Sequence, residues 1–132
     1  MSRDDGTGLL GTAAGLVMVV AFLLLAIDTG LTLLVRSTVG AAATDAATIV
    51  ARAAGPDGVL TTDELEAATV RARDRVDALA GSAATMSPPS FDGRSGSVTV
   101  TVRRPGPRTF AALRAGSATV ERSATVRLEV LR

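Results

Sequence analysis

The sequence contains no cysteine and no histidine, and its aromatic residues are limited to three phenylalanines. Without cysteine the chain forms no disulfide, offers no thiolate nucleophile and cannot build a cysteine-ligated zinc or iron–sulfur site. Without histidine it lacks the usual general base and the commonest metal ligand. These absences argue against an enzyme, and we expect no catalytic, cofactor-binding or metal-binding residues.

Net charge is also small, because 14 basic and 13 acidic residues give a formal charge of +1 with the two signs interspersed. Such a chain creates no extended positive field for a phosphate backbone, and it has almost no rings on which bases could stack. We therefore expect no nucleic-acid partner.

What the sequence does contain is one long hydrophobic run, residues 9–27, which reads LLGTAAGLVMVVAFLLLAI and holds no charge. As a helix this run covers roughly 28 Å, close to the ~30 Å hydrocarbon core of a bilayer. With its largely apolar continuation it predicts a single-pass helix over residues 9–36 that anchors the chain in the cytoplasmic membrane, in contact with lipid. Residues 1–8 are expected to form a short polar tail.

Small and acidic residues of this span are candidates for helix packing. Gly11 and Gly15 are four residues apart and share a helix face, which permits close approach of a second helix in lipid. Gly30 and Asp28 are further candidates. Asp28 has two interpretations: it lies at the membrane interface at little cost, or a longer tilted helix immerses it and a neighbouring subunit supplies its partner.

Cleavage as a signal peptide is an alternative, since residues 40–43, Gly-Ala-Ala-Ala, are of the kind that signal peptidase accepts. Against it, the apolar run exceeds an ordinary signal-peptide core, and the basic region before it consists of Arg3 alone. Orientation is weakly indicated, because Arg36 and Arg52 against Arg3 favour a cytoplasmic C-terminus.

The soluble part, residues 37–132, is predicted to begin with a continuation of the membrane helix over 37–54. Its apolar residues recur at spacings of three and four, at Val39, Ala43, Ala46, Val50 and Ala53. Thr61 and Glu64 have the spacing of a capping box and start a second amphipathic helix over 62–80. We expect the apolar face of this helix to pack on the alanine-rich stripe of the first.

The period then changes from helical to alternating. Val98, Val100 and Val102 alternate with polar residues and predict a half-buried strand over 97–103, and a similar pattern predicts a strand over 118–131. A third short strand is expected near Thr85 and Met86. The fold class is therefore α+β: a transmembrane helix continuing into a long helix, a second helix packed on it, and a small antiparallel sheet of two to three strands.

This arrangement resembles that of TadE-like proteins, the minor pilins or pseudopilins of tight-adherence, Flp-type pilus systems. The resemblance lies in GTAAGLVMVVAFLLLAIDTGLTLLVRSTVGAAATDAATIVARA, in the Asp45-Ala46-Ala47 element after the span, in SVTVTV at 97–102 and in ATVRLEV at 124–130. It implies a pilin-like accessory subunit of a type IV-like pilus or related secretion apparatus. Its soluble part, residues 37–132, here called the head, would lie outside the cytoplasm. Implied partners are other pilin-like subunits and inner-membrane platform proteins, in homo- or hetero-oligomers.

One departure from the pilin pattern concerns processing. Related pilins carry a basic residue and glycine before the prepilin peptidase cut, and a glutamate at the fifth position of the mature helix. Here the candidate cuts follow Gly6 or Gly8, which would put Gly11 or Ala13 at that fifth position, and Asp5 precedes Gly6.

The alternative function is a stand-alone, membrane-tethered binding domain outside the cytoplasm, whose helix is only an anchor.

Overall fold

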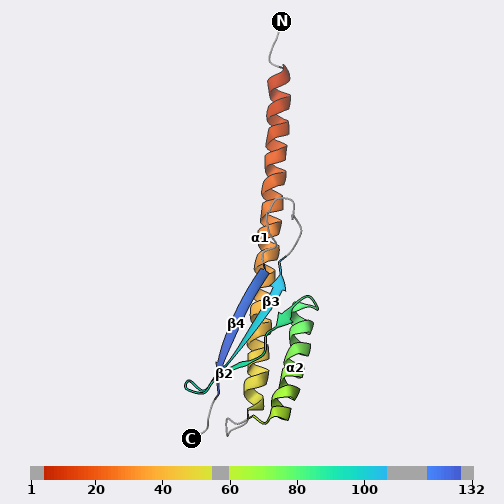
Figure 1. Ribbon diagram of the computed structural model, residues 1–132. Helices are drawn as coiled ribbons and strands as arrows, with labels where there is room; N and C mark the ends of the chain where they lie inside the picture. The colour runs from red at the N-terminus through yellow and green to blue at the C-terminus, as the bar shows by residue number, and fades with distance from the viewer. Residues whose placement is uncertain (1–4, 55–59, 107–118, 129–132) are drawn as a thin grey trace.

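The computed structural model describes residues 5–54, 60–106 and 119–128, with side chains from Gly11 onward. The elements, in order, are α1 (Asp5–Ala53), α2 (Thr62–Ala80), β1 (Thr85–Met86), β2 (Ser90–Asp92), β3 (Ser97–Pro105) and β4 (Thr119–Arg127). In Figure 1, α1 is a long rod whose C-terminal half is flanked by α2 and the strands, whereas its N-terminal half extends beyond them. The α+β class expected from the sequence is confirmed.

Helix α1 is continuous over 49 residues, so the apolar run and the predicted soluble helix are one element. It begins at Asp5, and residues 5–8, expected in a polar tail, therefore belong to its first turns. It ends at Ala53, two residues before the glycine-proline pair that the sequence offers as a stop. The sequence also predicts a turn over residues 56–60, which lies outside the described residues except for Leu60.

Helix α2 begins with the capping box that the sequence predicted. Thr61 is extended, its hydroxyl oxygen accepts from the Glu64 backbone N–H at 3.3 Å, and the Glu64 carboxylate accepts from the Thr61 N–H at 3.0 Å. The helix ends at Gly81, whose φ of 82° suits glycine and whose N–H donates to the Asp77 carbonyl at 2.9 Å. Both ends are thus fixed by local hydrogen bonds.

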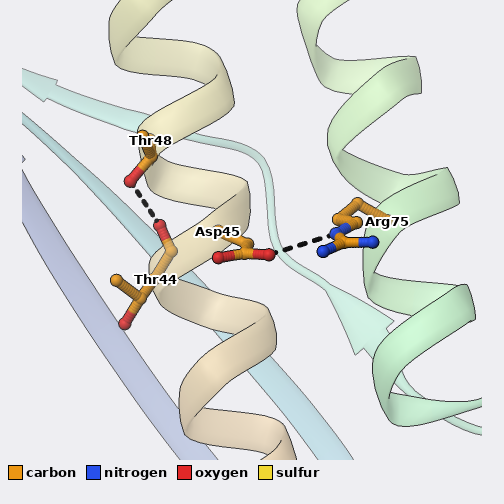
Figure 2. A network of polar contacts seen from close by, with 4 residues as sticks. All are labelled: Thr44, Asp45, Thr48 and Arg75. Atoms are coloured by element: carbon orange, nitrogen blue, oxygen red, sulfur yellow. Dashed lines mark hydrogen bonds and ion pairs between the residues drawn. The ribbon is translucent and has the colours of Figure 1, made fainter.

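The two helices pack through small side chains. Fully buried positions of α1 are Val39, Ala42, Ala43, Ala46, Ala47 and Val50, and those of α2 are Ala68, Ala72, Val76 and Ala80. The predicted stripe is confirmed except at its end, where Ala53 is half-buried and Ala54 is buried instead. Beside this contact Arg75 pairs with Asp45 at 3.1 Å (Figure 2). Both side chains are about half exposed, so the pair adds at most about 1 kcal/mol.

The sheet has four strands, not the two to three expected. β3 is central and antiparallel to all its neighbours, with β4 along one side and β1 and β2 along the other. β2 was not predicted, because three residues are too few to show an alternating pattern. The turn that follows it is held by the Asp92 carboxylate, which accepts from the Arg94 N–H at 3.0 Å and from the Ser95 hydroxyl at 2.7 Å. β3 extends to Pro105, and β4 ends at Arg127; residues 118 and 129–131 of the predicted strand lie outside the described residues.

One face of the sheet completes the core against α1. Val98, Val100 and Val102 are fully buried and Val120 is buried, as the alternation predicted. On the outer face the hydroxyls of Thr99 and Thr125, and of Thr101 and Ser123, are hydrogen-bonded at 2.8 Å across the two long strands. Throughout the part of the chain that the structure describes, no buried side-chain nitrogen or oxygen lacks a partner.

Candidate helix-packing surface

The N-terminal half of α1 exposes large apolar side chains that a protein in water would bury. Leu16, Phe22 and Leu34 are 67%, 66% and 61% exposed, and the apolar window of the helix has none of its residues buried. The helix is long and apolar enough to cross a membrane. Since contiguous exposed apolar surface of this size needs an apolar surrounding, this half of α1 is a candidate single-pass membrane anchor.

The glycines of the span have no role in packing the head. Gly11, Gly15 and Gly30 are exposed, and a Cβ added to any of them would meet no atom of the described residues within 4 Å. Glycine also weakens a helix by about 1 kcal/mol relative to alanine in an aqueous helix interior. Contacts among residues 11–54, 60–106 and 119–128 therefore give no reason for these glycines, whereas close approach by a second helix would.

These glycines lie on a longer surface, here called the back face of α1, on the side opposite the head. Its members, which are exposed except for the half-buried Thr48, are spaced three, four or seven residues apart: Gly11, Gly15, Val19, Ala26, Gly30, Ser37, Ala41, Thr44 and Thr48. None carries a charge. The two seven-residue steps pass Phe22 and Leu33, which are large and exposed on the same side of the helix. Figure 2 shows Thr44 and Thr48 directed away from α2, with the Thr48 hydroxyl donating to the Thr44 carbonyl at 2.8 Å.

Asp28 does not belong to this surface, although the sequence made it a packing candidate together with Gly30. Residues two apart on a helix point in opposite directions, so Asp28 and Gly30 lie on opposite sides of α1. Asp28 lies on the same side of α1 as Val35 and Val39, the side that the head covers further along the helix, and it is half-buried. The four candidates thus divide into three glycines on the back face and one carboxylate on the head side.

The candidate processing residues Gly6 and Gly8 lie within the first turns of α1, where the backbone is helical. Their role in cleavage stays a prediction.

Two carboxylates have shifted pKa values, and local structure explains both. Hydrogen bonds from the Thr61 hydroxyl and backbone lower the pKa of Glu64, and those from the Ser95 hydroxyl and the Arg94 backbone lower the pKa of Asp92. Both groups are exposed, and they serve a helix cap and a turn. Among the described residues, no three acidic side chains gather closely enough to hold a metal ion.

The aqueous part of the back face, from Ser37 to Thr48, is the feature that reading the sequence missed. The signal was present, since small uncharged residues recur at helical spacing from Ser37 to Thr48, opposite the stripe that the head buries. An alanine-rich helix has small side chains on all of its faces, however. Only the placement of α2 and the sheet therefore distinguishes the residues that the head covers from those that it leaves exposed.

No family model, curated protein or solved structure matches this chain. The geometry of α1 therefore carries the functional argument.

Proposed function

We propose that the chain is a membrane-anchored, pilin-like accessory subunit, similar to TadE-like proteins, that acts in assembly of a tight-adherence or related pilus or secretion apparatus. The observation that carries this proposal is the back face of α1, which is uncharged through both the apolar half and the head half of the helix and consists mostly of small residues, with Phe22 and Leu33 as the large ones. A tether needs an apolar span but has no need of such a surface in the head.

The length of the back face favours a helix as its partner. From Gly11 to Thr48 it extends roughly 55 Å along one straight line of helix, which another rod can follow and a compact domain cannot. In lipid, glycine and alanine allow two backbones to come close enough for van der Waals contact, which is the main attraction between helices there. In water, the methyl groups of Ala41, Thr44 and Thr48 would be buried by the same partner.

The partners proposed are the long helices of other pilin-like subunits, either copies of this chain or different ones, and those of inner-membrane platform proteins. In TadE-like proteins the head lies outside the cytoplasm, and we place it there for this chain also. The two or three arginines that favour the opposite orientation are a weaker indication than the layout of the whole chain.

Cysteine crosslinking tests this function, because the chain has no cysteine of its own and every introduced thiol is unique. In native membranes Gly15→Cys and Ala41→Cys should crosslink to a helix of the assembly. Val17→Cys, two residues and about 200° away from Gly15 on the opposite side of α1, is the matched control and should not. Absence of crosslinks from both back-face positions, or equal crosslinking of Val17→Cys, would contradict the proposal.

Exchanging the span distinguishes this function from the alternative, a membrane-tethered binding domain. Replacing residues 9–27 with an unrelated apolar helix of equal length leaves a tether functional and abolishes assembly by a packing helix. Retention of pilus or secretion activity after this exchange would favour the tether.

Processing at Gly6 or Gly8 is measured independently. The intact mass of the protein recovered from membranes distinguishes loss of six or eight residues, of about forty at the signal-peptidase-like site, or of none. Because the sequence contains no lysine, an amine-selective label applied to the intact protein marks its amino terminus and identifies the first residue.

A further inference from the structure

Three arginines lie at the end of the head from which the apolar half of α1 emerges. In the register of the long strands Arg104 is opposite Val120, and Arg122 is opposite Val102. Cross-strand partners share a face of the sheet, so both arginines lie on the same face as the buried valines, in the last rows before the sheet ends. The alternating pattern of the sequence did not assign these two arginines to a face; the strand register does.

The third arginine comes from α1. Arg36 precedes Val39 by three residues and Ala43 by seven, so it lies on the side of α1 that the head covers, one turn before the covering begins. Arg104 lies nearby at the end of α2, since its guanidinium Nη2 would be 3.9 Å from a Cβ on Gly81. Figure 1 shows the end of α2, the tip of β3 and the start of β4 together at this end of the head.

Little helix separates this end of the head from the apolar span. Leu33 and Leu34 are 58% and 61% exposed, as fully as leucines in the middle of the span, so the apolar surroundings must extend to them. From Leu34 to Val39, the first fully buried residue, is about 7 Å of helix. The headgroup layer of a bilayer is itself roughly 5–8 Å deep, so the end of the head reaches its outer boundary.

We propose that Arg36, Arg104 and Arg122 form a collar that binds the phosphates of anionic phospholipids in the bilayer that α1 crosses. Guanidinium groups are suited to phosphate, because their planar donors bond it in pairs and they are weakly hydrated. The two ion pairs among the described residues, Arg75–Asp45 and Arg103–Glu121, leave these three arginines out. The collar rests on membrane insertion of α1 and fixes the head against the lipid surface, with its back face free for assembly.

The test measures lipid preference of the full chain in phosphatidylcholine vesicles that carry trace amounts of spin-labelled phosphatidylglycerol or spin-labelled phosphatidylcholine. The expected result is preferential association of the anionic lipid, by up to about fivefold for each arginine at about 0.1 M salt, with the preference lost at about 1 M salt. Arg36→Gln with Arg104→Gln and Arg122→Gln should remove it.

A matched variant carries Arg52→Gln, Arg94→Gln and Arg127→Gln, which removes the same charge at the other end of the head. Arg52 lies about 24 Å beyond Arg36 along α1, more than two Debye lengths at ordinary salt, and this variant should keep the preference. Because Arg104 lies against α2, the double variant with Arg36→Gln and Arg122→Gln provides a second test that leaves this contact intact. Equal loss in both triple variants would overturn the proposal, as would absence of any preference in the unaltered chain, the result expected if the collar binds an acidic protein segment instead.

Discussion

The two halves of α1 belong to one uninterrupted helix but have opposite relations to their surroundings. Between residues 11 and 27 many side chains are large and apolar and almost all residues are exposed, whereas between 39 and 50 alanine predominates and one side is fully buried. In lipid, large side chains need no cover from the protein, because the solvent itself is apolar. In water the same helix must be covered, and small residues are what let α2 and the sheet come close.

This comparison also explains how a head with few large residues holds together. Its largest fully buried side chains are valines, so each contact contributes little and the core depends on many close contacts along α1. The head is thus expected to be sensitive to changes in side-chain size or charge on its inner surfaces. The span is expected to be insensitive to size except on its back face.

The largest expected effect comes from removing the cover of the head half of α1. Val100→Asp places a carboxylate in the fully buried middle of β3, at a cost on the order of 3 kcal/mol or more, which is enough to unfold a small head. Hydrogen exchange in detergent should show lost protection in α2 and the strands, with the span still protected. Thr101→Asp, on the outer face of the same strand, is the control; similar unfolding by both would contradict the assigned faces.

A second variant pair compares the two sides of α1 directly. Ala46→Leu enlarges a fully buried residue and should destabilise the head by about 1–3 kcal/mol, because neighbouring groups must move to admit it. Ala41→Leu makes the same change on the back face and should alter stability by less than about 0.5 kcal/mol while impairing assembly. Denaturant unfolding measures the first effect and crosslinking the second. Impaired folding in both variants would mean that the back face is covered within the monomer.

A third prediction concerns α2, which covers the head half of α1 and depends on its cap. Thr61→Ala removes the acceptor for the Glu64 N–H and should cost about 1 kcal/mol. Thr62→Ala, one residue into the helix, is the matched control and should change little. Thermal unfolding of the head followed by far-ultraviolet circular dichroism gives both values, and equal losses would remove the cap as the cause.

The smallest effect expected is a pH dependence confined to the head. The Thr61 hydrogen bonds lower the pKa of Glu64 in the folded state, so this group stabilises the head above the pKa of the unfolded chain. That stabilisation is lost as the pH falls through the lowered folded value. Glu64→Gln should therefore flatten the acid side of the curve of thermal midpoint against pH. An unchanged acid limb would exclude Glu64 as its source, leaving Asp92, whose pKa is lowered in the same direction.

Several parts of this structure were predictable because their causes are local. The capping box needed only Thr61 and Glu64 at the right spacing, and the strand around Val100 needed only its alternation. Strand β2 was missed because it pairs through a turn held by Asp92, and its three residues carry no period. The position of Arg104 and Arg122 on the same sheet face as the buried valines was not predicted for a related reason. A charged residue near the end of a strand interrupts the apolar alternation that marks the buried face.

The sequence by itself determined that one end of this protein is a long apolar helix, because hydropathy and helical spacing depend only on the order of residues along the chain. Only the tertiary structure decided which side of that helix the head covers. A segment rich in alanine, serine and threonine has no distinct apolar face of its own, so the contacts of α2 and β3 must select one. That selection leaves the back face uncovered and brings three arginines, distant in sequence, to the end of the head where the apolar span begins.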